Sequence, residues 1–166
     1  MFLYALYLGG KAKGANIEVH DVVFLISVDL DKDKQKIKDL WFGDKSSVHI
    51  DAIARIDGAG GYKVVVLEDL EQPQTHEDKL YFINFGASGN GTFDEKHEAD
   101  FFVANSRQEA IKQAKEKLLK GEKDVHLDNF LDIDNCLDVS RLVKGQIKLV
   151  KENGYQVIIE NVYKKL

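Results

Sequence analysis

The feature that most constrains this chain is an internal repeat. When the sequence is shifted by 77 positions, residues 1–57 align with residues 78–134 without a gap, and 13 of the 57 pairs are identical. Self-similarity at one fixed offset indicates a tandem duplication. The identical pairs include Leu3-Tyr4 with Leu80-Tyr81, Gly9 with Gly86, Glu18 with Glu95, His20 with His97, Val48-His49 with Val125-His126, and Asp51 with Asp128.

The repeat also predicts how the chain is divided. The polar stretch 71–78 contains the single proline, Pro73, and is typical of a linker. It separates a first repeat, residues 1–70, from a second repeat, residues 79–166. Gly61-Tyr62 recurs as Gly154-Tyr155 at an offset of 93, which predicts an insertion near 135–150 in the second copy. Because each copy is small for an independent core, we expect both to fold as one cooperative domain.

The two copies predict the same order of elements. Apolar runs at 2–8 and 80–85 are typical of strands covered on both faces. Ser106 and Glu109 form a capping-box pattern at the start of a helix, and Asp29 occupies the position of Ser106 in the first copy. Strands and hairpins follow in each copy, the second hairpin being marked by Asn153-Gly154. The predicted fold class is therefore α+β: two tandem β-β-α-β-β repeats related by a pseudo-twofold, with mainly antiparallel sheet and helices packed on one side.

Composition excludes several classes of function. The net charge of −5 argues against a general nucleic-acid binder, which would need a surplus of Lys and Arg. The apolar run at 2–8 is too short to cross a bilayer, so no membrane partner is expected. The single cysteine, Cys136, excludes an internal disulfide and suits a reducing compartment. We expect a soluble, cytoplasmic protein, and the sequence leaves a homo-oligomer open.

Part of the first copy resembles a known family. The stretch from Tyr7 to Val22, together with Trp41-Phe42-Gly43 and the following His49-Ile50-Asp51, is similar to a bacterial family of uncharacterised proteins, the domain of unknown function 1543. The resemblance covers about residues 4–68 and is looser over 80–160. It implies no activity, cofactor or catalytic residue.

Four of the five histidines form two aligned pairs, each close to carboxylates. Because residues two apart in a strand share a face, Glu18 and His20 should point the same way, as should His49 and Asp51. On the strand 49–57 the even residues should face inward and the odd residues outward. The candidate site residues are Glu18, His20, Asp21, His49 and Asp51 in the first copy, and Glu95, His97, Glu98, His126 and Asp128 in the second.

Three interpretations of these residues stay open. They could bind a divalent metal, with His20 and His49 as the first ligands to consider, or perform acid–base catalysis. They could also have a structural role that both copies retain, in which each ring satisfies backbone groups or carboxylates at the start of a strand. No recognised metal-binding spacing decides among them.

The glycine-rich loop of the first copy is a candidate anion-binding loop, because successive backbone N–H groups can surround a phosphate. Its residues are Gly9, Gly10, Lys11, Lys13 and Gly14. The spacing matches no established phosphate-binding motif, so turn glycines without a ligand are the simpler interpretation.

The sequence favours a binding or interaction module for a small polar ligand or a protein partner. The alternative is a metal-assisted or His/carboxylate-dependent hydrolytic enzyme. The two differ in one expectation: an enzyme requires the histidines of one copy to converge, with asymmetry between the copies. No particular cofactor is indicated.

Overall fold

The computed structural model describes residues 1–67, 78–88, 95–118, 125–127 and 136–166, and for 87–88, 95 and 125–127 it describes the backbone alone. The chain forms two compact units. The first contains residues 1–73 and 142–166, and the second contains residues 74–141. Among the described helices, none is long and apolar enough to cross a membrane.

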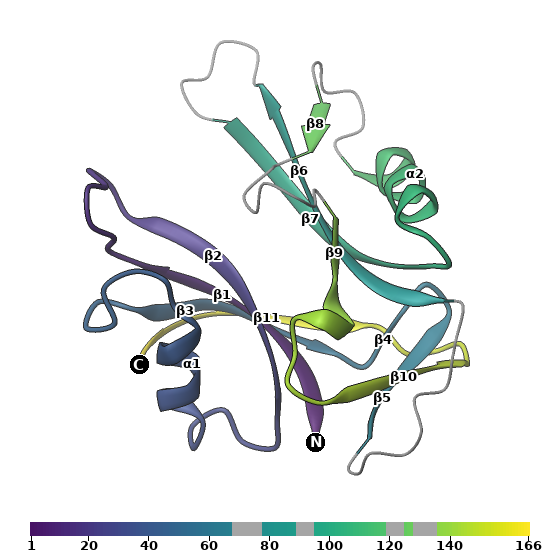
Figure 1. The fold of residues 1–166 in the computed structure, drawn as a ribbon, viewed down its shortest axis with the longest axis horizontal. Helices are drawn as coiled ribbons and strands as arrows, with labels where there is room; N and C mark the ends of the chain where they lie inside the picture. The colour runs from purple at the N-terminus through teal and green to yellow at the C-terminus, as the bar shows by residue number, and fades with distance from the viewer. Residues whose placement is uncertain (68–77, 89–94, 119–124, 128–135) are drawn as a thin grey trace. The chain divides into compact units, whose positions relative to one another are not determined.

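The first unit is built on a four-stranded antiparallel sheet with the order β11-β3-β1-β2. The central strand β1 therefore lies between β2 and β3, as Figure 1 shows. Its strands are β1 (Phe2–Gly10), β2 (Val19–Ser27), β3 (His49–Ile56) and β11 (Val157–Lys165). The outer strand β11 comes from the end of the chain and pairs with β3.

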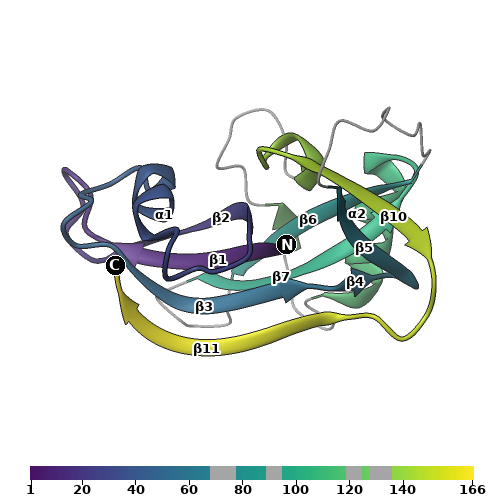
Figure 2. The ribbon, with the colours of Figure 1, turned by 90° about the horizontal axis from the view of Figure 1, so that it is seen from below.

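Helix α1 (Lys34–Leu40) covers one face of this sheet (Figure 2). Alternate residues of β1, among them Leu6 and Leu8, pack against Ile37 and Trp41 in one hydrophobic core. An amphipathic helix thus buries its apolar face on the sheet. A second, smaller sheet with the order β10-β5-β4 completes it. Its strands are β4 (Gly58–Ala59), β5 (Tyr62–Leu67) and β10 (Gln146–Lys151).

The second unit is also built around a central strand, β6. Strands β7, β8 and β9 all pair antiparallel with β6. Helix α2 packs on Tyr81, Ile83 and Phe85 of β6, the positions aligned with Tyr4, Leu6 and Leu8. The elements are β6 (Lys79–Ser88), β7 (Glu95–Ala104), α2 (Arg107–Lys117), β8 (Val125–Leu127), β9 (Cys136–Asp138) and the 3-10 turn η1 (Val139–Arg141).

The predicted α+β class with mainly antiparallel sheet is confirmed, while the pseudo-twofold stays a prediction. The Ser106 cap is present, its Oγ accepting from the backbone N–H of Glu109 at 3.3 Å. Helix α1 instead begins after Asp33, and Asp29 accepts from Asp31 and Lys32 in the turn before it.

The C-terminal strands differ from the sequence prediction. The predicted hairpin at Asn153-Gly154 is wrong, because β10 pairs with β5 whereas β11 pairs with β3. The sequence division assigned these strands to the second repeat, but in the structure their hydrogen bonds tie them to the first unit. The predicted insertion near 135–150 begins at residue 135, outside the described residues, and stays a prediction. No local sequence pattern reports pairing between segments about one hundred residues apart.

Candidate metal centre

The register of the first sheet brings two of the predicted histidines to the two sides of one glycine. Gly9 of β1 lies opposite His20 of β2 and opposite His49 of β3. The next residue, Gly10, faces Trp41 and the α1 side of the sheet. Because side chains alternate along a strand, the row Gly9–His20–His49 lies on the face away from α1.

A β-bulge brings Asp51 to the same row. Tyr7 pairs with Ala52 while Leu8 pairs with Ile50, so Asp51 is an extra residue on β3. The predicted alternation along 49–57 is therefore wrong beyond the bulge: Ile53, rather than Ala52, packs against the α1 core. Bulges commonly redirect a side chain beside a functional site.

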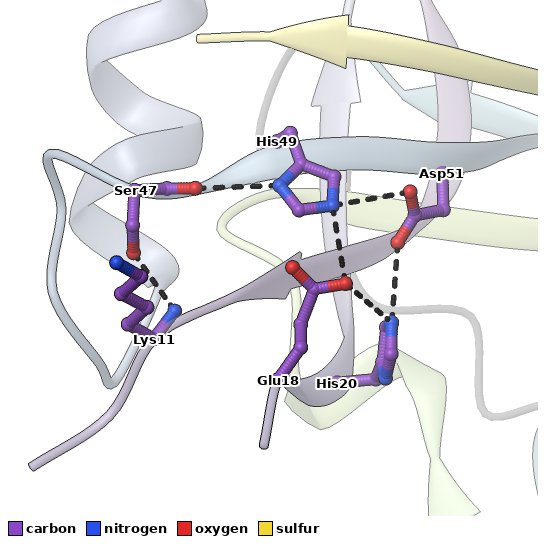
Figure 3. A network of polar contacts seen from close by, with 6 residues as sticks. All are labelled: Lys11, Glu18, His20, Ser47, His49 and Asp51. Atoms are coloured by element: carbon purple, nitrogen blue, oxygen red, sulfur yellow. Dashed lines mark hydrogen bonds and ion pairs between the residues drawn. The ribbon is translucent and has the colours of Figure 1, made fainter. Parts of the chain in front are cut away.

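Four side chains from two segments, residues 18–20 and 49–51, meet (Figure 3), and a Cβ at Gly9 would point toward them. The Nε2 atom of His20 lies 3.4 Å from Glu18 Oε1 and 3.4 Å from Asp51 Oδ2. The Nε2 atom of His49 lies 3.6 Å from Glu18 Oε1 and 3.2 Å from Asp51 Oδ1. Imidazoles and carboxylates therefore alternate around a ring of four contacts, which we call the Gly9 cluster (Glu18, His20, His49 and Asp51).

The second ring nitrogen of His49, Nδ1, contacts a backbone carbonyl, which orients the imidazole ring. Its Nδ1 lies 3.3 Å from the carbonyl oxygen of Ser47, and the side chain is only 5% exposed. Since a carbonyl can only accept, this contact is a hydrogen bond in the tautomer that carries its proton on Nδ1, and in that tautomer Nε2 presents a lone pair to two carboxylates. A ring nitrogen lone pair facing two carboxylates is a donor set that a metal ion can occupy. A ligand histidine held through its other nitrogen is the usual pattern in metal sites.

Two further features, a carboxylate oxygen of Asp51 and the missing side chain of Gly9, suit an ion bound beside Gly9. Asp51 Oδ2 is buried and makes no hydrogen bond in the structure. A Cβ at Gly9 would lie 2.6 Å from Asp51 Oδ2 and 2.8 Å from His49 Nε2. Glycine at this position therefore leaves open the volume toward which the cluster's polar atoms point.

Two tyrosines support the histidine rings. Tyr7 stacks on His20 with ring centroids 5.1 Å apart and planes at 2°, and Tyr163 packs on His49 at 4.7 Å. Burial raises the pKa of Tyr7, and the negative charge of Asp51 raises it further. Tyr7 therefore stays neutral near pH 7 and acts as a packing surface for His20.

The spacing of the cluster suits an ion between its members. Ligands that share a tetrahedral zinc at about 2.0–2.2 Å lie about 3.3–3.6 Å from one another. The contacts of 3.2–3.6 Å fall around that range, and three of the four exceed the usual N–H···O length of about 2.7–3.2 Å. Ligand atoms of Glu18, His20 and Asp51 lie within 4.8 Å of one another, and His49 joins this group through its contacts with Glu18 and Asp51 rather than as a fourth member within that distance.

The other candidates of the first copy lie outside the cluster. Asp21 is opposite Leu8, on the α1 face, and accepts from the backbone N–H of Val22. In the candidate anion loop, the N–H of Lys11 donates to Ser47 Oγ and that of Ala15 to Ala12. Gly14 has a φ of +88°, as expected of a turn glycine. Lys13 is exposed.

In the second copy, His97 and Glu98 are exposed on β7, His126 is placed by the backbone of β8, and Glu95 begins β7. Asp128 lies outside the described residues. Sequence reasoning assigned Gly9 to an anion loop and missed its place beneath the cluster, and it missed Tyr7, Tyr163 and the Ser47 carbonyl. The alignment of Gly9 with Gly86, between aligned histidines, was the available signal.

Both copies of the sequence match one known protein family. The family described as Domain of Unknown Function (DUF1543) matches residues 15–66 and 93–142, which together make up more than half of the chain. The chain belongs to this family. The resemblance seen in the sequence is therefore confirmed, and the DUF1543 match falls in two segments, one in each copy.

A solved structure shares the fold. The crystal structure of a protein Il1583 from Idiomarina loihiensis superimposes with a TM-score of 0.59 and 23% sequence identity, and the match covers 99% of this chain and 88% of that chain. At this identity the likeness concerns the fold alone. A search of curated proteins gave no match.

Proposed function

We propose that this DUF1543 protein binds a divalent transition-metal ion, zinc or manganese, at the Gly9 cluster. The observation that supports it best is the buried His49, whose Nδ1 is held by a carbonyl and whose Nε2 faces two carboxylates. Two histidines and two carboxylates are a ligand set that suits these ions. A module that binds a small polar ligand or a protein explains less well why these four side chains point toward one another.

Metal-assisted hydrolysis is the activity that such a centre would favour. Glu18 and His20 are 50% and 36% exposed, so one side of the cluster is open to solvent. A tetrahedral ion held by all four side chains has no open position, so hydrolysis would require a water to take the place of one exposed ligand, Glu18 or His20. Bound metal lowers the pKa of such a water so that it can act as a nucleophile. This second proposal depends on the first and concerns reaction type, since the substrate is set by groups beyond the cluster.

The experiment is a metal titration of the untagged protein with Zn²⁺ and Mn²⁺, followed by calorimetry and elemental analysis. We expect the affinity of the Gly9 cluster to fall by more than about 100-fold in His49→Ala, because loss of even an outer-shell partner typically costs about 10–100-fold. His76→Ala is the matched control, since this histidine belongs to neither aligned pair. Circular dichroism would verify that each variant is folded.

The structural alternative gives a different result. If His49 is simply a protonated partner of Asp51, neither ion will bind measurably and neither will raise the melting temperature of the wild-type protein. His49→Ala would then lower stability without changing metal content, and the proposal would be overturned.

A further inference from the structure

We infer that the second unit carries a second metal-binding row, centred on Gly86 and formed by His97 and His126. This inference rests on the proposed function of the first unit and assigns a site of the same chemical class to the second. It would make the chain a protein that binds two metal ions, one in each unit.

The backbone register supports the assignment. Gly86 of β6 lies opposite His97 of β7 and opposite His126 of β8. Gly9 has the same two partners in the first unit, His20 and His49. In both units a buried glycine of the central strand thus has a histidine on each neighbouring strand.

The core fixes which face of the second sheet carries this row. Ile83 and Phe85 of β6 pack in the core with α2, as Leu6 and Leu8 pack with α1 in the first unit. Side chains alternate along a strand, so Gly86 lies on the face away from α2. The row therefore occupies the same face of its sheet as the Gly9 cluster. Glu95, at the start of β7, is two residues before His97, as Glu18 is before His20.

The acidic ligand from the third strand distinguishes the two rows. In the first unit, Gly9 pairs with His49 and Leu6 pairs with Ile53. Three residues along β1 therefore correspond to four residues along β3, and the extra residue is Asp51. In the second unit, Gly86 pairs with His126 and Ile83 pairs with Cys136. Three residues along β6 therefore correspond to ten residues along the neighbouring chain. Among the described residues of β8 and β9, none is an extra residue that would place a carboxylate beside Gly86, so we expect the second row to bind metal at least tenfold more weakly than the first.

The test counts ions per chain in the full-length, untagged protein by elemental analysis after equilibration with excess Zn²⁺ and gel filtration in zinc-containing buffer. We expect two ions in the wild type, one in His49→Ala, and one in the double variant His97→Gln/His126→Gln. A measurement on the wild type avoids any folding defect: Mn²⁺ should first broaden the amide signals around Gly9 and then, at higher concentration, those of Gly86, His97 and His126.

The outcomes separate the two proposals. One ion in the wild type, retained in His97→Gln/His126→Gln, with broadening around Gly9 alone, overturns the second row and leaves the first site intact. One ion that is retained in His49→Ala but lost in the double variant supports the second row and overturns the proposed function of the first unit. No bound ion overturns both.

Discussion

The two units have the same central register but differ on one flank. In the first unit, β3 is continuous past the site, with a one-residue bulge at Asp51, and β11 pairs along its outer edge. In the second unit, the same flank of β6 is shared by two short strands, β8 and β9. Strand pairing alone therefore places a histidine on each side of the central glycine in both units, whereas the Gly9 cluster also depends on the continuous strand β3 and its outer neighbour β11.

The outer strand of the first unit is adapted to this bulge. The register of β11 against β3 shifts between Asn161 and Lys164, directly opposite the bulged segment. Of the two residues within this shift, Val162 packs against the α1 core, while Tyr163 packs on His49. A strand from the end of the chain thus contributes one side of the site.

The largest expected effect is a loss of stability on a core substitution in the second unit, which tests whether the two units unfold together. Phe85 is fully buried in the second unit, so Phe85→Ala should lower the free energy of unfolding by about 3–5 kcal/mol. The single tryptophan, Trp41, lies in the first unit and reports its unfolding separately. If the chain is one cooperative domain, the urea midpoint measured by Trp41 fluorescence will shift with that measured by circular dichroism.

The exposed Val28 provides the control, since Val28→Ala should change stability by no more than about 0.5 kcal/mol. A Trp41 transition that does not move in Phe85→Ala would show that the units unfold independently, contrary to the expectation from the sequence.

The next effect concerns Gly9, the residue beneath the Gly9 cluster. Gly9→Ala places a methyl group 2.6 Å from Asp51 Oδ2 and should weaken Zn²⁺ binding by about 10–100-fold, measured by calorimetry. Gly10→Ala introduces its methyl group against Trp41 and Ser47 Oγ at 3.1 Å, on the α1 side. That variant should lose stability but keep its affinity for zinc. Equal affinities in the two variants would contradict the position of the site above Gly9.

A smaller effect distinguishes the two helices. Ser106 caps α2 with its side chain, whereas the N-cap of α1, Asp33, makes no side-chain cap hydrogen bond. Ser106→Ala should therefore cost about 1 kcal/mol of stability. Gln108→Ala, at an exposed position of the same helix, is the control, with an expected change below about 0.5 kcal/mol in thermal unfolding. Equal changes in the two variants would show that the cap does not stabilise α2.

The smallest effect is a sensitivity of the first unit to acid. Hydrogen bonds from Lys164 and Lys34 hold the pKa of Asp31 below its usual value, and a hydrogen bond from Lys45 does the same for Asp39. Carboxylates with a lowered folded-state pKa contribute stability that is complete above their unfolded pKa of about 3.9 and is lost as pH falls through the folded value. The Trp41 urea midpoint should therefore fall below about pH 4, and less so in Asp31→Asn/Asp39→Asn. An equal fall in that variant would assign the acid sensitivity to other groups.

Much of the candidate site could be predicted from the sequence, because its parts follow local rules. Glu18 with His20, and His49 with Asp51, share faces through strand alternation, and the repeat drew attention to both histidines. Their convergence could not be predicted, because it depends on β1 lying between β2 and β3. The bulge at Asp51 was also hidden, since an extra residue in a strand leaves no change in composition.

The fold shows the same division between local and distant information. The Ser106 cap and the apolar central strands were predictable from a few adjacent residues. The pairing of β11 with β3 was not, and the Asn153-Gly154 turn favoured a hairpin that does not form. Turn residues indicate that the chain reverses, but the partner of each strand is selected by burial elsewhere in the unit.

The most direct test of the Gly9 cluster is anomalous X-ray diffraction at the zinc edge from crystals equilibrated with Zn²⁺. The account predicts an anomalous peak about 2.0–2.2 Å from His20 Nε2 and His49 Nε2, in contact with Glu18 and Asp51. A map with no peak above Gly9, and with His49 hydrogen-bonded directly to Asp51, would contradict it.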